Sequence, residues 1–137
     1  MYISRGLLEQ IIAHALEDPK NEVCGVVAVD SATPARAVRV HRAVNIYASP
    51  MKFQIEPNEL LRLWNACEEE GGTLGAIYHS HVRSKPYPSQ TDVNFAANWP
   101  GVEWVIVGLA PGQEPEVRSY LISEGQIEEV ALSEQVS

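Results

Sequence analysis

Two histidines, a serine and an aspartate near the middle of the chain have the types and spacing of a metal-dependent hydrolase site. They lie in the stretch IYHSHVRSKPYPSQTD, residues 77–92, as His79, His81, Ser89 and Asp92. Side chains alternate faces along a strand, so His79 and His81 point the same way and can share one metal ion. Neutral imidazole is the commonest metal-ligating side chain and suits zinc in particular.

A third ligand is expected from the helix that follows this loop. Ser89 and Asp92 are three residues apart at its start, and such positions share one helical face, so both can point toward the histidines. With Asp92 as ligand, two imidazoles and one carboxylate leave a fourth tetrahedral position open for water, as in a catalytic zinc site. Zinc lowers the pKa of that water to near neutrality and polarises a substrate carbonyl.

Such a site also needs an oxyanion donor and a proton shuttle. Ser89 is the local candidate for the donor, because its hydroxyl beside the metal could bond the developing oxyanion. The shuttle should be a carboxylate on a neighbouring strand, and spacing alone does not choose it from eighteen acidic residues. Glu22 stands out because it begins an apolar strand, where a charge is costly unless it serves a purpose.

The pattern H-x-H-x7-S-x-x-D, with Glu22 upstream in EVCGVV, resembles the JAMM (MPN+) metallopeptidase family. The resemblance covers most of the chain, from the first expected helix through VEWVIVGL. It implies that His79, His81 and Asp92 bind zinc, one ion per chain. It also implies that Glu22 activates the metal-bound water and that Ser89 helps to stabilise the tetrahedral intermediate.

Two further stretches, YPSQTDV and RSYLISEGQIEEV, resemble the small actinobacterial Mec-type branch of this family. Members of that branch remove cysteine from the C-terminus of a ubiquitin-like sulfur carrier protein. The resemblance therefore implies hydrolysis of the bond after the Gly-Gly tail of such a partner, with release of cysteine for cysteine biosynthesis. The chain is also too short for the long insertions with which eukaryotic relatives hold polyubiquitin.

Alternative interpretations remain open at this point. The chain could process other carrier tails, act like a JAMM deubiquitinase, or serve as a non-catalytic MPN-type scaffold. A relative of the DNA-linked RadC branch would read HNHPSG where this chain reads HSHVRS. Ser89 could simply cap the following helix, a common role for serine. Without the family pattern, Glu22 would be taken as an exposed residue at a strand end.

The elements that must position these residues follow from hydrophobic periodicity and turn residues. Helices are expected from Ser4 to about Asp18, over residues 58–72 with Gly71 and Gly72 at the end, and over residues 92–99. Strands are expected at EVCGVVAV, ARAVRVHRAV, MKFQIE, TLGAIYHSH, VEWVIVGLA, VRSYLI and IEEVAL. MKFQIE is also a candidate edge for pairing with the substrate tail.

This order of elements predicts one α/β domain over residues 1–137, a mixed α+β arrangement. Its single central mixed β-sheet would be flanked by helices, as in the MPN/cytidine-deaminase-like sandwich. Hydrophobic residues make up 45% of the chain, enough for a core without disulfide bonds.

Composition restricts the partners. Ten basic residues against eighteen acidic ones give a net charge of −8, which argues against binding to nucleic acid. The sequence shows no secretory signal and no membrane span, and its two cysteines, Cys24 and Cys67, form no C-x-x-C pattern. We therefore expect a reduced, cytoplasmic protein that binds no membrane, with Cys24 packed in the core. A homodimer is left open.

Overall fold

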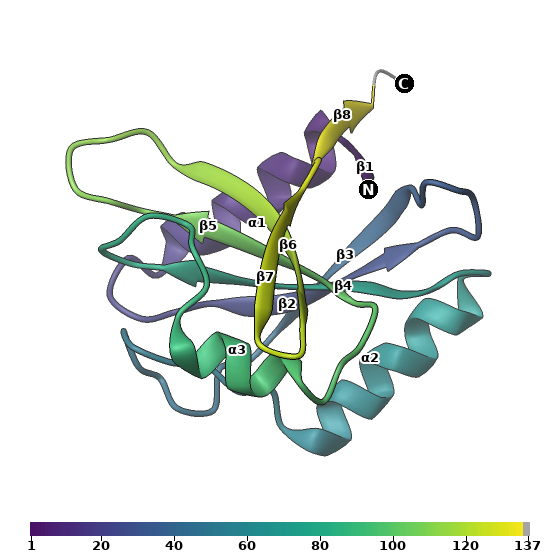
Figure 1. Ribbon diagram of the computed structural model, residues 1–137, viewed down its shortest axis with the longest axis horizontal. Coiled ribbons are helices and arrows are strands. Elements are labelled where there is room, and N and C mark those ends of the chain that lie inside the picture. Colours follow the sequence, from purple (N-terminus) through teal and green to yellow (C-terminus); the bar gives the residue numbers. More distant parts are fainter. Residues whose placement is uncertain (136–137) are drawn as a thin grey trace.

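The computed structural model describes residues 1–135 and is built around a twisted, six-stranded mixed sheet (Figure 1). In spatial order its strands are β3 (Ala37–Ala43), β2 (Cys24–Val29), β4 (Thr73–His81), β5 (Glu103–Gly108), β6 (Glu116–Ser123) and β7 (Gln126–Val130). β4 and β5 are parallel, and the other neighbouring pairs are antiparallel. A small second sheet pairs β1 (Tyr2–Ser4) with β8 (Ser133–Gln135).

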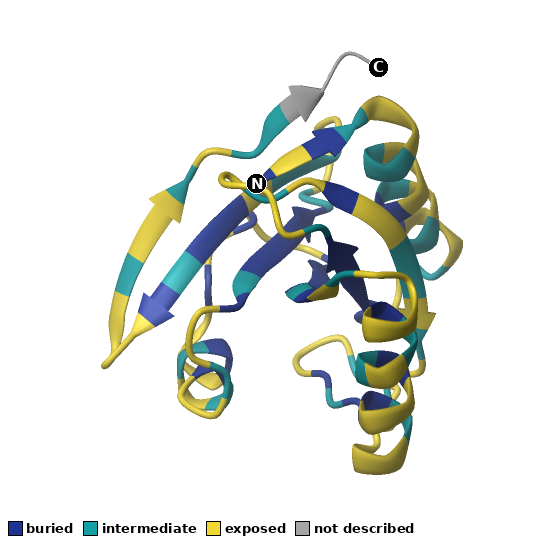
Figure 2. Cartoon of the chain, turned by 90° about the vertical axis from the view of Figure 1, so that its right-hand side faces the viewer, coloured by how far each residue is buried: buried dark blue, intermediate teal, exposed yellow. Residues whose placement is uncertain are grey.

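The helices cover the two faces of the six-stranded sheet and bury its central strands. α1 (Arg5–Glu17) packs on one face, while α2 (Pro57–Glu69) and α3 (Gln90–Ala96) lie on the other (Figure 1). Every residue of β2 is buried, which explains its continuous apolar sequence, and the central strands are dark blue in Figure 2. The predicted mixed α/β fold with a helix-flanked sheet is confirmed.

The predicted helices agree with the structure to within two or three residues. Ser4 caps α1 by accepting a hydrogen bond from the Leu7 N–H. Gly71 follows α2 with φ +81°, a left-handed conformation that favours glycine. Gly72 has another role than the one predicted. A Cβ there would lie 1.9 Å from the Val29 carbonyl oxygen, so glycine permits β4 to begin against β2.

The prediction of a strand at MKFQIE is wrong, and with it the idea that this segment offers a sheet edge to the substrate tail. Residues 52–56 are irregular. Asn45 holds the segment as a loop: its amide donates to the Lys52 carbonyl, and its side-chain oxygen accepts from the Gln54 N–H. The alternation that indicated a strand instead buries Phe53 and Ile55 beneath the neighbouring helix.

Both cysteines are free and fully buried. Burial raises the pKa of the Cys24 thiol to about 12 and that of Cys67 to about 11. Cys24 belongs to the core between the sheet and α2, as predicted. Over residues 1–135, no helix has the length and apolar character needed to cross a membrane.

Candidate metal centre

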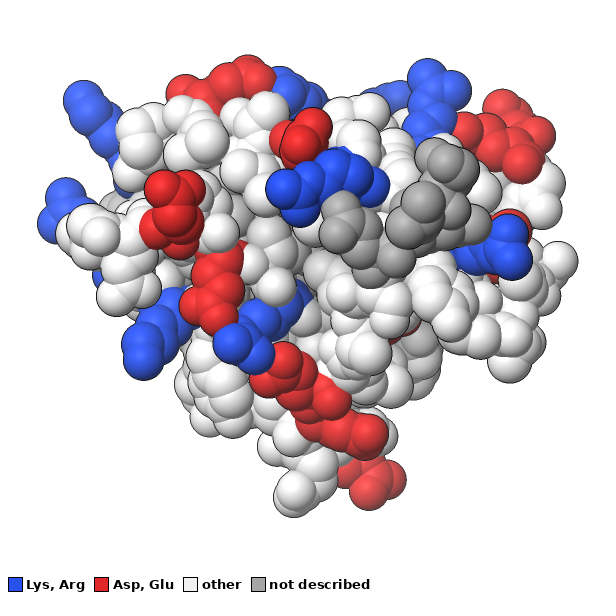
Figure 3. Space-filling view, turned by 90° about the horizontal axis from the view of Figure 1, so that it is seen from above, with Lys and Arg blue, Asp and Glu red and all other residues white. Residues whose placement is uncertain are grey.

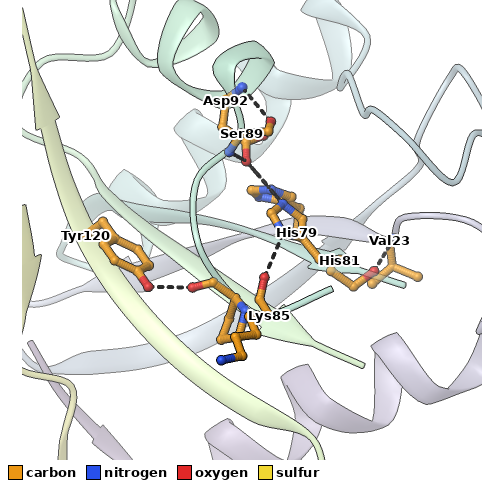
Figure 4. Close-up of polar contacts among 9 residues, drawn as sticks. Val23, His79, His81, Lys85, Ser89, Asp92 and Tyr120 are labelled. Atoms are coloured by element: carbon orange, nitrogen blue, oxygen red, sulfur yellow. Dashed lines mark hydrogen bonds and ion pairs between the residues drawn. The ribbon is translucent and has the colours of Figure 1, made fainter. Parts of the chain in front are cut away.

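His79 and His81 lie at the C-terminal end of β4, in the middle of the sheet. β4 and β5 are parallel, so the chain must cross over between them, and this crossover carries α3 and Asp92 back toward the histidines. Figure 4 shows the two imidazoles side by side beneath the start of α3. Phe53 from the irregular loop stacks on His79, with ring centroids 4.4 Å apart, and restricts the orientation of that imidazole.

Three ligand atoms converge in this buried space. The Nε2 atoms of His79 and His81 are 3.2 Å apart, and Asp92 Oδ2 is 3.1 Å from each of them. His81 Nδ1 is 3.1 Å from the Lys85 carbonyl oxygen, an acceptor only, so Nδ1 carries the proton and Nε2 presents its lone pair to the site. Lone pairs gathered this closely repel one another unless a proton or a metal ion lies among them. The donor set therefore fits a metal ion.

The electrostatics of the three groups are strongly coupled. Burial alone would raise the pKa of Asp92, but the two imidazoles and the Ser89 N–H outweigh burial and hold that pKa far below its usual range. Burial lowers the pKa of His79, which has no exposed surface. For His81, burial acts in the same direction, but the hydrogen bond and charge of Asp92, the Lys85 carbonyl and the charge of Glu22 together outweigh burial, so its pKa is raised. The carboxylate is thus kept ionised, as a metal ligand must be.

A capping box fixes Asp92 at the start of α3. The Ser89 hydroxyl oxygen accepts a hydrogen bond from the Asp92 N–H (3.1 Å), and Asp92 Oδ2 accepts one from the Ser89 N–H (2.9 Å). The alternative role of Ser89 as a helix cap is therefore present in the structure. Capping occupies the oxygen of the hydroxyl as an acceptor and leaves its proton free to donate. Both roles can be carried by the same side chain.

Glu22 lies just before β2 and not within it, because its N–H bonds to the Ser49 carbonyl and its carbonyl accepts from Asn45. Its side chain is only 6% exposed, and Oε1 has no hydrogen-bond partner among the described residues. Burial raises the pKa of this carboxyl group to about 8, against an opposing effect of His81. An unpartnered buried carboxyl beside a metal-type cluster is a candidate general base.

The loop that joins β4 to α3 is held by groups that the sequence did not single out. The Tyr120 hydroxyl donates to the Pro86 carbonyl at 2.5 Å (Figure 4). Gly108 lets the loop approach β5 closely, since a Cβ there would lie 2.5 Å from the Pro86 ring. Together these contacts place the Lys85 carbonyl on His81. In the sequence, the glycine at the end of the apolar strand, Gly108, only weakly indicates a close approach of two backbones. The role of the Lys85 backbone carbonyl has no sequence signal at all.

The structure thus brings His79, His81 and Asp92 into contact, with Ser89 in the capping box. Glu22 and Ser89 line a common cleft of about 570 Å³. Besides these two, its walls are formed by Lys20, Pro50, Met51, His81, Val82, Arg83 and Ser84. The cleft gives a substrate access to the buried cluster.

A sequence profile of prokaryotic homologs of the JAB domain matches residues 4–123. The CysO-cysteine peptidase of Mycobacterium tuberculosis is 34% identical over 131 residues, 94% of this chain and 87% of its own. A probable TtuB-protein conjugate cleaving protease of Thermus thermophilus is 38% identical over 133 residues, 96% and 81% of the two chains. A desampylase of Haloferax volcanii is 39% identical over 104 residues, 72% and 73%.

Solved structures share the fold. A protein from Desulfitobacterium hafniense superposes with a TM-score of 0.85 at 28% identity, covering 98% of this chain and 94% of its own. A JAB1/MPN domain protein from Archaeoglobus fulgidus superposes with a TM-score of 0.63 at 22% identity, covering 97% of both chains. The second likeness concerns the fold alone.

Proposed function

The chain belongs to the prokaryotic JAB-domain family, of the JAMM (MPN+) type, and we propose that it is a zinc peptidase that cleaves a ubiquitin-like sulfur carrier protein after its C-terminal Gly-Gly, releasing cysteine. The observation that carries the proposal is the convergence of three buried ligand atoms beside the unpartnered carboxyl of Glu22. The names of the similar proteins support the substrate class, because they include a CysO-cysteine peptidase and a TtuB-conjugate cleaving protease.

In the proposed reaction, His79, His81 and Asp92 hold one zinc ion per chain. When bound, zinc supplies Lewis acidity, which acidifies water and polarises the scissile carbonyl. Glu22 takes a proton from the attacking water and later delivers it to the leaving amine. A pKa raised toward neutrality suits a group that must both accept and donate a proton.

Ser89 is proposed to donate its hydroxyl proton to the oxyanion that forms on the Gly carbonyl. Its oxygen already accepts the Asp92 N–H, so the hydroxyl is oriented before the substrate binds. The two free, buried cysteines suit a reducing compartment, and we propose that the protein acts in the cytoplasm.

The test is intact mass spectrometry of a ubiquitin-like sulfur carrier ending in Gly-Gly-Cys, before and after incubation with the protein. Loss of one cysteine residue, abolished by a chelator and by Asp92→Asn, is the expected result. Metal analysis of the purified protein should show one zinc per chain. An unchanged carrier mass with zinc bound would reject cysteine release. Cleavage of a carrier joined to a lysine side chain, with the Cys-ended carrier intact, would assign conjugate cleavage instead.

A further inference from the structure

Two basic side chains, Lys20 and Arg83, line the cleft together with Glu22 and Ser89. Both are exposed, and neither forms an ion pair within the part of the chain that the structure describes. The chain carries eighteen acidic residues and a net charge of −8, so two unpaired cations in one cleft differ in sign from the molecule as a whole. Two such cations in one cleft give it a positive wall in a negatively charged protein.

Most of the other arginines are paired with acids, Arg36 being an exception among the described residues. Arg39 contacts Glu70, Arg42 binds Glu17, Arg62 contacts Glu59, and Arg118 binds Glu116 and Glu129. On the face seen in Figure 3, several basic side chains likewise lie against acidic ones. Arg83 is therefore available to an anionic ligand that enters the cleft, and a guanidinium stays charged at any working pH.

The proposed mechanism determines where such an anion would lie. Glu22 must reach the leaving nitrogen to deliver its proton, so that nitrogen lies beside Glu22 in the cleft. In a C-terminal amino acid, the α-carboxyl carbon is roughly 2.5 Å from the nitrogen, across one Cα atom. The carboxylate released with the amino acid must then lie close to Glu22, in the space that Lys20 and Arg83 border.

Resting on the proposed function, we infer that Arg83, assisted by Lys20, binds the α-carboxylate of the leaving amino acid. The planar guanidinium matches a carboxylate in a bidentate manner, whereas the lysine contributes a point charge. Met51, Pro50 and Val82 supply an apolar wall for a small leaving side chain. The site would thus select substrates with a single amino acid after Gly-Gly.

An isopeptide substrate lacks this group. Its leaving nitrogen is a lysine Nζ on an uncharged methylene chain. Such a substrate therefore has no carboxylate close to the leaving nitrogen for Lys20 and Arg83 to bind. Arg83 and Lys20 therefore favour removal of a terminal residue over cleavage of a protein conjugate. They are specificity-determining residues, and they take no part in the proton transfers.

The test compares two substrates: a ubiquitin-like sulfur carrier ending in Gly-Gly-Cys with a free carboxylate, and the same carrier with a C-terminal carboxamide. The wild-type protein should cleave the acid with a kcat/KM at least about tenfold above that for the amide, the usual scale of a charge-assisted hydrogen bond. Arg83→Gln should lower this ratio, and the double variant with Lys20→Gln should lower it further, close to one.

Arg36→Gln is the matched control. Arg36 is an exposed arginine without an ion-pair partner among residues 1–135, and it lies next to Ala37, whose register partner Val29 is at the far end of β2 from the cleft. This variant changes the net charge equally and should keep the wild-type ratio. An acid-to-amide ratio that stays at the wild-type value in the double variant would overturn the inference while leaving the peptidase intact. Failure to cleave either carrier would instead reject the proposed function.

Calorimetry gives a second readout that does not need turnover. Glu22→Gln protein should bind the acid carrier without consuming it, with a Kd at least about tenfold below that for the amide carrier. Adding Arg83→Gln and Lys20→Gln should remove the difference. Equal Kd values for the two carriers in the Glu22→Gln protein would contradict carboxylate recognition.

Discussion

Glu22 shows how one side chain can serve catalysis at the expense of stability. It is buried without a hydrogen-bond partner for Oε1, so its ionised form is poorly solvated in the folded protein. A glutamate placed only for stability would be exposed or paired. The unfavourable placement is accounted for if the carboxyl must exchange protons with a substrate in the cleft.

Replacing this carboxyl should separate turnover from metal binding. Glu22→Gln keeps the size of the side chain but cannot accept a proton from water, so we expect kcat to fall at least about 100-fold. The zinc content, measured by metal analysis, should not change, because Glu22 is not among the three ligands. A variant that cleaved the carrier at the normal rate would remove Glu22 from the proposed mechanism.

The same variant should change how stability depends on pH in the metal-free protein. The folded-state pKa of Glu22, about 8, exceeds the ordinary value of 4.5, so between these values the folded protein binds more protons than the unfolded chain. The contribution of this proton binding to the stability of the folded protein is fully present below about pH 4.5 and is lost as the pH rises through about 8. Denaturant unfolding should show a wild-type loss of up to about 5 kcal/mol relative to Glu22→Gln over this window. Parallel curves for the two proteins would contradict the raised pKa.

At the scale of elements, the site depends on backbone placement that sequence patterns describe only in part. The strand TLGAIYHSH was predicted with its observed bounds, because a largely apolar run follows directly after Gly71 and Gly72. MKFQIE alternates polar and apolar residues as a strand would, yet the Asn45 side chain takes backbone groups that a strand would pair. The strand propensity of these residues cannot reveal that a side chain elsewhere in the sequence competes for their backbone hydrogen bonds. β1 and β8 were not predicted either, since strands of three residues carry too little periodicity.

The close approach of the β4–α3 loop to β5 predicts a local defect on adding one methyl group. Gly108→Ala would place a Cβ within 3.0 Å of the Pro86 ring and of the Ser84 carbonyl, so the loop must shift and the Lys85 carbonyl must leave His81. We expect zinc affinity to fall about 10-fold or more, the usual effect of losing such a supporting contact. Competition with a chromogenic chelator measures it.

Gly6→Ala is the control for that substitution. Gly6 lies in α1, where an added Cβ meets no atom within 4 Å, so alanine should leave the zinc affinity unchanged and slightly stabilise the helix. Equal zinc affinities for Gly108→Ala and wild type would show that the loop can yield without disturbing His81.

The capping box at α3 separates two roles of Ser89. Ser89→Ala removes the cap, which should cost about 1 kcal/mol of stability and weaken zinc binding by loosening Asp92. At saturating zinc, kcat should still fall about 100-fold if the hydroxyl also bonds the oxyanion. Steady-state kinetics across a zinc titration distinguishes the two effects. Full kcat at saturating zinc would leave Ser89 with the cap alone.

For the whole molecule, the metal centre lies at one end of a sheet whose core does not depend on it. The two large apolar clusters on either face of the sheet involve every strand from β2 to β6. We therefore expect chelation to abolish cleavage and to lower the Tm, through the loss of bound ligand, without removing the fold. Far-ultraviolet circular dichroism before and after chelation checks this. Loss of the sheet signal on chelation would make the metal structural.

The burial of both thiols has a consequence for a protein that is proposed to handle cysteine. Exchange with disulfides and attack on alkylating agents require thiolate, and with pKa values near 12 and 11 neither Cys24 nor Cys67 supplies it at neutral pH. The folded chain can therefore meet cystine or oxidised glutathione without forming a mixed disulfide. The proposed reaction at the metal therefore does not depend on whether the surrounding cysteine is oxidised or reduced.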